Sequence, residues 1–389
     1  MSAKKDMDAL LQRFVDEGLS GCGVQVTQHG KTIYEGYAGY ADVEAKKPIT
    51  KDSVFRLASM SKIPMYTSLL MLYEKGYFNL TDPIGNWLPE WKSSRMYVRE
   101  ATGAISIVPC KNQITVSDVL SMKCGLPYCN SQAPTPDLTL TSMQECMKPL
   151  LEKGYYTLQE HVAAMSQAVL AFEPGTHWIY GFSSELAAAL IEKLTGESVD
   201  DVMQEFLFDP LKMDSTRSRF FGDIESRMVK AYGDGNTPLT GVTAMLDKKH
   251  QPGKENEAGW ARLYSTVNDY SNLMSMLANG GMFEGKKIMG RKTIDMMRSN
   301  GLDEVMMKDF YSMYNAGYGY GYGVRTLIDK AAGNHNGSLG AFGWTGGFGT
   351  WAEADPEDGV GIVYMHNHMP NGEEYYHHLI RTVAYGMVE

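Results

Sequence analysis

Strand patterns occur at both ends of this chain of 389 residues, and helical patterns fill the part between them. Residues 21–41 predict two strands around the turn signal His29-Gly30-Lys31, and residues 338–366 predict further strands around a turn at Asp355–Gly359. Strands must lie beside other strands to satisfy their backbone groups, so the two ends of the chain are expected to meet in one sheet.

Helical patterns surround these strands. The first residues form an amphipathic pattern with Leu10, Leu11 and Phe14 on one side, and residues 373–388 predict a closing helix. A helical stretch runs from about Ser59 to Gly76. Residues 80–300 are mostly helical by pattern, with long polar loops at 127–142 and 232–258.

The predicted fold class is therefore α+β: an antiparallel sheet built from both chain ends and flanked by helices, with an inserted, mostly helical lobe. The sheet domain is discontinuous and comprises residues 1–85 and 300–389, and the helical lobe comprises residues 86–299. Binding pockets favour interfaces between such units, so the active site is expected where the two meet.

The segment 317–324 reads GYGYGYGV and alternates strictly. This alternation predicts a strand with Tyr318, Tyr320 and Tyr322 on one face and glycines on the other. A glycine face allows another backbone or a helix to come close.

Charge and cysteine content limit the partners and the compartment. The net charge is −10 without a run of Lys or Arg, so nucleic acid and anionic membranes are poor candidates. No apolar stretch approaches the roughly 18 residues that span a bilayer, and the first residues lack the apolar region of a secretory signal. Five cysteines without a C-x-x-C pair predict free thiols and a cytoplasmic location, with a disulfide or metal role for Cys124 and Cys129 as the minor alternative.

Histidines near the C-terminus do not form a metal-binding motif. His366 and His368 share one face of a predicted strand, but a solvated strand end explains them better than a metal site. His377 and His378 are expected on the polar surface of the closing helix. No metal is therefore predicted.

Ser59-Met60-Ser61-Lys62 forms an S-x-x-K pattern at the start of a helix. Side chains three residues apart share one helix face, and a neutral Lys62 there can take the Ser59 proton. A helix-capping serine would explain Ser59 equally well. It would not explain Lys62, because the helix dipole disfavours a cation in the first turn.

Tyr180 and a glycine-rich segment are two further candidates, and each has an ordinary structural interpretation. Tyr180 lies in a loop that enters an amphipathic helix, where a tyrosine usually packs, so it matters for catalysis only if it faces Ser59. The segment Gly343–Thr350 fits a bulge or bend in a strand. The alternative is a backbone edge whose N–H groups face a ligand and form an oxyanion hole.

Ser59-x-x-Lys62, Tyr180 and Trp344-Thr345-Gly346, in this order, resemble the three active-site elements of the serine β-lactamase and penicillin-binding-protein superfamily. The resemblance extends over roughly residues 20–365 and is greatest to the class C β-lactamase-like branch and its family VIII esterases. The connecting segments that carry it are Leu80–Ile84, Ile114–Pro127 and Leu263–Tyr270.

Two departures from the β-lactamases bear on the substrate. Phe182 stands where they carry the Asn of Tyr-x-Asn, and Trp344 stands where they carry the Lys of Lys-Thr-Gly. That Lys pairs with the carboxylate common to β-lactams and D-alanyl peptides. An indole has one N–H donor and no charge, and losing a charge-assisted partner costs about 1.5–3 kcal/mol. Both departures resemble the esterase branch and imply neutral ester substrates.

The resemblance implies a carboxylesterase that acts on a small-molecule ester or amide through an acyl-enzyme and needs no cofactor. Ser59 would be the nucleophile, Lys62 with Tyr180 the general base, and the N–H groups of Ser59 and Gly347 the oxyanion hole. The residues expected to contact substrate are Trp344, Thr345, Gly346 and Phe182.

Three alternatives remain at this point. A β-lactamase or D-aminoacyl peptidase would need another cation in place of the missing Lys, and Arg325 is one candidate. An acyltransferase would use an alcohol or amine instead of water. A catalytically inactive binding domain on the same fold is disfavoured because Ser59, Lys62 and Tyr180 are all present.

Overall fold

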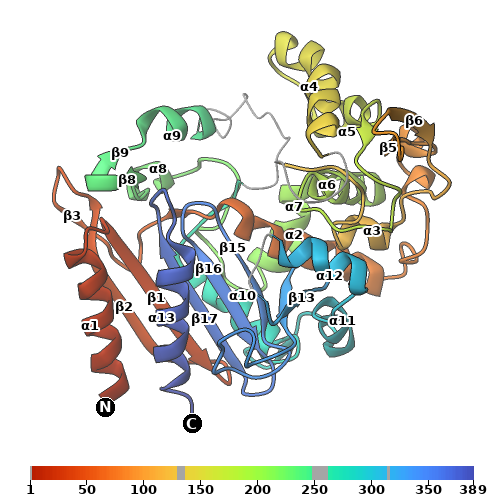
Figure 1. Cartoon of the computed structure of the whole chain (residues 1–389). Coiled ribbons are helices and arrows are strands. Elements are labelled where there is room, and N and C mark those ends of the chain that lie inside the picture. Colours follow the sequence, from red (N-terminus) through yellow and green to blue (C-terminus); the bar gives the residue numbers. More distant parts are fainter. Residues whose placement is uncertain (1, 129–135, 248–261, 313–315) are drawn as a thin grey trace.

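The computed structural model describes residues 2–128, 136–247, 262–312 and 316–389 (Figure 1). Its main sheet has eight antiparallel strands in the order β13-β14-β15-β16-β17-β1-β2-β3. These strands are β1 (Gly21–Gln28), β2 (Lys31–Asp42), β3 (Lys47–Pro48), β13 (Tyr318–Tyr320), β14 (Arg325–Leu327), β15 (Phe342–Thr345), β16 (Trp351–Asp355) and β17 (Val360–His366). Because β1 pairs with β17, the predicted meeting of the two chain ends is confirmed.

Helices cover both faces of this sheet. On one face α1 (Ser2–Asp16) lies beside α13 (Glu373–Tyr385), over a core that includes Trp351 and Tyr364 (Figure 1). On the other face α10 (Val267–Ala278) packs against β1, β16 and β17. Helix α10 thus lies within residues 86–299, the predicted helical lobe, and still belongs to the layers of the sheet.

The other described helices include those of the lobe beside the sheet. They are α2 (Lys62–Glu74), α3 (Val116–Leu120), α4 (Pro136–Lys153), α5 (Leu158–Met165), α6 (Ser183–Thr195), α7 (Val199–Met203), α8 (Ile224–Arg227), α9 (Thr240–Asp247), α11 (Arg291–Met297) and α12 (Glu304–Tyr311). The short strands are β4 (Phe55–Arg56), β5 (Arg95–Arg99), β6 (Ile105–Pro109), β7 (Val169–Leu170), β8 (Tyr232–Gly233), β9 (Thr237–Pro238), β10 (Tyr264–Ser265), β11 (Met282–Phe283) and β12 (Lys286–Lys287). One continuous apolar core joins the lobe to the sheet, with Leu69 of α2, Leu186 of α6 and Val363 of β17 among its members.

The alternating tyrosine segment forms a shorter strand than predicted. Tyr318 and Tyr320 are buried in β13, but the amide of Gly321 donates to the Val324 carbonyl at 2.9 Å and turns the chain. Tyr322 therefore leaves the strand, and its hydroxyl lies 3.3 Å from that of Ser117.

The histidine predictions are wrong in part. His366 and His377 are fully buried, because α13 covers the end of β17, and His368 is buried as well. Burial lowers the pKa of His366 well below its usual value. Within the described ranges, no three His, Cys, Asp or Glu side chains are grouped so as to hold a metal ion.

Cys22, Cys110, Cys124 and Cys146 are free thiols, and Cys129 lies outside the described residues, as does any disulfide that it would make. Among the helices that the structure describes, none combines the length and apolar character that a bilayer span requires.

Candidate active site

Ser59 lies in a tight turn between β4 and α2. The turn is a 3-10 helix, η1 (Ala58–Ser61), and Ala58 has a φ of 47°, in the left-handed region that side chains disfavour. Ser59 is inside this turn and not at its N-cap, which is Leu57, so the helix-capping interpretation is wrong. A strained backbone immediately before a half-buried serine is typical of functional sites.

The turn is held against the end of β15. The Leu57 amide donates to the Leu263 carbonyl at 2.9 Å, and the Thr350 hydroxyl donates to the Leu57 carbonyl at 2.9 Å. A Cβ atom on Gly346 would lie 2.1 Å from the Leu57 oxygen, so only glycine allows this approach. The glycine-rich segment therefore lies directly beside the Ser59 turn, as its functional interpretation requires.

Lys62 points at Ser59 from the first turn of α2. Its Nζ lies 3.3 Å from Ser59 Oγ, and the side chain is fully buried. Burial by itself lowers the pKa of Lys62, but Tyr128, Tyr180 and the Glu185 carboxylate outweigh it, so the pKa of Lys62 lies above its usual value. The resting site thus favours an ammonium at Lys62 rather than the neutral amine expected from the sequence.

Tyr180 is held by an unusually close pairing of two loops. The Phe182 amide donates to the Leu126 carbonyl at 2.8 Å, and the Tyr128 amide donates to the Tyr180 carbonyl at 3.2 Å. A Cβ atom on Gly181 would lie 1.7 Å from the Leu126 oxygen, so this contact also needs glycine. The pairing places the Tyr180 ring 5.1 Å from Lys62 Nζ, so Tyr180 lies beside the residue that contacts Ser59.

Trp344 completes this group from the sheet side. Its indole Nε1 donates to Tyr180 Oη at 3.1 Å, and the two ring centroids are 5.2 Å apart. The donor that replaces the β-lactamase Lys is therefore engaged with the proposed base. Ser59 and Lys62 come from one turn, Tyr180 and Trp344 come from distant parts of the sequence, and the four form one connected site between the lobe and the sheet.

Tyr128 is a further residue of the site that the motifs do not single out. Its ring centroid lies 5.2 Å from Lys62 Nζ and 5.6 Å from the Tyr180 ring, and its hydroxyl lies 2.9 Å from that of Ser184. Phe182 packs on the same ring at 4.4 Å. The only sequence signal for Tyr128 is its position directly after Gly125-Leu126-Pro127, one of the segments of the family resemblance.

The remaining predicted residues lie at the end of β15. Gly347 is exposed in the turn that follows the strand, and a Cβ atom there would meet nothing within 4 Å among the described residues. Its amide, with that of Ser59, stays the predicted oxyanion hole. Thr345 faces the other side of the sheet from Trp344, and its hydroxyl donates to Glu373 at 3.0 Å.

Arg325, the alternative partner for a substrate carboxylate, is engaged within the protein. Its Nη1 lies 2.8 Å from Oε1 of Glu373, with the Arg side chain 11% exposed. Its guanidinium also lies 5.3 Å from the centroid of the Tyr318 ring.

A half-buried hydroxyl beside a buried amine that contacts a tyrosine is an arrangement suited to nucleophilic catalysis with proton transfer. The chain is also similar to known proteins. Esterase EstB from Burkholderia gladioli is 24% identical over 93% of this chain and 89% of its own length. Two solved structures share the fold: EstCE1, described as a hydrolase with promiscuous acyltransferase activity, has a TM-score of 0.79, 23% identity and 99% coverage of both chains. The simvastatin synthase LovD from Aspergillus terreus has a TM-score of 0.78, 17% identity and coverage of 99% of this chain and 97% of its own.

The family model named Beta-lactamase matches residues 7–385, which is almost the whole chain. The resemblance inferred from the three motifs is therefore confirmed at the level of the family and the fold. On this evidence, the chain belongs to the beta-lactamase family.

Proposed function

We propose that this protein is a serine hydrolase that cleaves carboxylic esters through an acyl-enzyme on Ser59. The observation that carries the proposal is the 3.3 Å approach of the buried Lys62 Nζ to Ser59 Oγ. A structural lysine gains nothing from being buried in a first helical turn, where the dipole opposes it. A lysine that holds or moves a proton at Ser59 must lie within reach of the Ser59 hydroxyl, as Lys62 does.

In the proposed reaction, Ser59 Oγ attacks the ester carbonyl and its proton passes to the coupled pair of Lys62 and Tyr180. With Lys62 as an ammonium, Tyr180 serves as the base in its phenolate form: Tyr180 Oη accepts the Ser59 proton, becomes a neutral hydroxyl, and then gives that proton to the departing alkoxide. The N–H groups of Ser59 and Gly347 would stabilise the oxyanion, each by roughly 10²–10³ in rate. A water molecule, activated by the same pair, then releases the acid.

A neutral ester is the proposed substrate class. Trp344 brings no charge, and its one N–H already binds Tyr180. The rings of Tyr128 and Phe182 supply apolar surface beside Lys62. EstB is named an esterase, and this likeness supports the same class of reaction here.

An acyltransferase is the second candidate. The observation in its favour is that EstCE1 is described as a hydrolase with promiscuous acyltransferase activity. Both reactions share the acyl-enzyme on Ser59 and differ in the acceptor.

The test compares hydrolysis of p-nitrophenyl butyrate and of nitrocefin by the wild type, Ser59→Ala and Ser68→Ala. Ser68 lies on α2, the helix that follows the Ser59 turn, and its hydroxyl donates to the Pro64 carbonyl, so its variant controls for the loss of a nearby serine hydroxyl. Ester turnover that is lost only in Ser59→Ala, with little nitrocefin turnover, is expected. Strong nitrocefin turnover would favour a β-lactamase. Full ester turnover by Ser59→Ala would refute the proposal.

A further inference from the structure

The carboxylate of Glu373 bridges two donors beside the proposed site. Oε1 of Glu373 lies 2.8 Å from Nη1 of Arg325, and Oε2 accepts a hydrogen bond from the Thr345 hydroxyl at 3.0 Å. A guanidinium and a hydroxyl that bind the two oxygens of one carboxylate form a complete carboxylate-binding set. In this protein the set is occupied by the chain's own side chain.

This set lies where the pairing of β14 with β15 ends, and it is partly exposed to solvent. Strand β14 begins at Arg325, opposite Gly343, so it does not run alongside Trp344 and the residues after it. Thr345 directly follows Trp344, whose indole contacts Tyr180, and stands two residues before Gly347. The Glu373 side chain is 24% exposed, so the bridge is open to solvent on one side.

The surroundings of Arg325 and Thr345 favour an anion. Glu373 is the first residue of the thirteen-residue helix α13, whose positive dipole end therefore points at the bridge. The pKa of the Glu373 carboxyl is raised by burial, but Arg325 and His377 outweigh that effect and hold it below its usual value. The carboxylate thus remains charged and bound at neutral pH.

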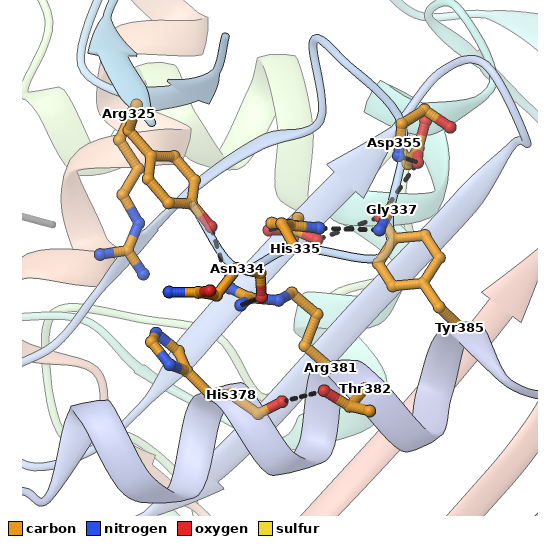
Figure 2. A network of polar contacts seen from close by, with 12 residues as sticks. Arg325, Asn334, His335, Gly337, Asp355, His378, Arg381, Thr382 and Tyr385 are labelled. Carbon is orange, nitrogen blue, oxygen red and sulfur yellow. Dashed lines mark hydrogen bonds and ion pairs between the residues drawn. The ribbon is translucent and has the colours of Figure 1, made fainter. Parts of the chain in front are cut away.

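A network of polar contacts fixes the helix that carries Glu373 (Figure 2). Arg381 of α13 donates to the Tyr318 hydroxyl at 2.9 Å and to the Asn334 carbonyl at 3.2 Å. Tyr385 donates to Glu353 and to Asp355, each at 3.0 Å. With α13 attached at these points, Glu373 cannot be withdrawn from Arg325 by a shift of the whole helix.

We propose that Glu373 is a specificity-determining residue that takes the place of a substrate carboxylate and so excludes carboxylate-bearing substrates. This inference rests on the proposed esterase function, since it concerns the same site. Removing the Glu373 charge would leave Arg325, Thr345 and the start of α13 ready to bind an external carboxylate.

The experiment uses p-nitrophenyl hexanoate and the p-nitrophenyl monoester of adipic acid, which differ only in a terminal methyl or carboxylate. In Glu373→Gln, the kcat/KM ratio of the anionic to the neutral ester is expected to rise about ten-fold or more. Glu374→Gln removes the same charge from the neighbouring, exposed position and should leave the ratio unchanged. The double variant Glu373→Gln/Arg325→Gln should lose the gain.

Equal ratios in Glu373→Gln and the wild type would overturn the inference, as would an equal gain in Glu374→Gln. If Glu373→Gln folds poorly, Glu373→Ala provides a second variant without the carboxylate, and it should raise the same kcat/KM ratio. A second measurement needs no turnover: benzoate should raise the melting temperature of Glu373→Gln but not of the wild type. If the wild type hydrolyses neither ester, the proposed function fails, while the benzoate shift still decides the role of Glu373.

Discussion

The two faces of β15 and β16 differ in the partners that surround their charged side chains. On the face toward the lobe, Trp344 contacts Tyr180, and the cation of Lys62 lies among tyrosine rings and hydroxyls. On the face toward α13, His335 Nε2 lies 3.1 Å from Glu353 and Arg325 lies 2.8 Å from Glu373, so each carboxylate has a direct partner. One step along the strand, from Trp344 to Thr345, separates the two arrangements.

This difference indicates a separate role for each face: proton transfer on the lobe face and stabilisation on the α13 face. A buried ion pair holds its geometry, because removing one partner leaves an uncompensated charge. A cation that faces neutral hydroxyls can exchange a proton with them at lower cost, which a general base requires. We therefore expect substitutions on the lobe face to change rates and substitutions at His335, Glu353 and Arg381 on the α13 face to change stability.

Lys62→Met should show the largest effect and the clearest separation. It removes the charged member of the proposed base, so kcat for p-nitrophenyl hexanoate should fall about 10²–10⁴-fold. The melting temperature should hold or rise, because an apolar chain of similar length replaces a buried charge. Arg381→Met on the opposite face is the matched control and should lower the melting temperature with little change in kcat. A Lys62→Met enzyme with wild-type kcat would break the comparison.

Glu353→Gln should lower the stability of the fold and leave the activity almost unchanged. It replaces the carboxylate that is hydrogen-bonded to His335 and Tyr385. Each hydrogen bond to a charged group is worth about 1.5–3 kcal/mol, so the free energy of unfolding should fall by about 3–5 kcal/mol. Urea unfolding measures this change, and kcat should stay within about three-fold of the wild type. If kcat fell and the unfolding free energy did not, the roles of the two faces would be reversed.

Low pH should reduce the stabilisation that Glu353 provides on the α13 face, over a defined pH range. Burial raises the pKa of the Glu353 carboxyl, but His335 and Arg381 outweigh it, and the pKa falls to about 2. Its stabilising effect, about 3 kcal/mol, is complete above the unfolded-state pKa near 4.5 and is lost as the pH falls toward 2. Urea unfolding at pH 6 and pH 3.5 should show a loss of about 1–2 kcal/mol that Glu353→Gln does not share. Equal losses in both proteins would assign the acid sensitivity to other groups.

Trp344→Phe should have the smallest effect. It keeps an aromatic ring beside Tyr180 but removes the 3.1 Å hydrogen bond to Tyr180 Oη. One neutral hydrogen bond is worth about 0.5–1.5 kcal/mol, so kcat should fall about two- to ten-fold. Stopped-flow measurement of the acylation burst would locate the loss in the first step; an unchanged burst rate would mean that Trp344 serves packing alone.

The parts of the molecule that local patterns determine could be predicted from the sequence. Ser59 and Lys62 are three residues apart, so their approach follows from helix geometry alone. The terminal strands alternate or are bounded by turn signals, and the sheet of both chain ends followed from them. The placement of α10 on the sheet could not be predicted, because a helical pattern does not say what the helix packs on.

The parts that depend on distant contacts could not be predicted from the sequence. Tyr128 reaches Lys62 only because the loops at Leu126 and Phe182 pair. His377 is polar by type, and it is buried because α13 lies against β17. Glu373 meets Arg325 across a separation of 48 residues, and neither residue belongs to a motif.

The pairing of β1 with β17 also determines when the central sheet can form during translation. Cys22 and His366 are register partners, so the central sheet cannot close until nearly all of the chain has been made. Contacts of such long sequence separation carry a large loop-closure entropy and slow the folding step that forms them. Ser59 and Lys62 leave the ribosome early, whereas Gly346, which lies against the Leu57 carbonyl at the start of the Ser59 turn, leaves late. We therefore expect a nascent chain to remain without an assembled candidate site until β15 and β17 have been made.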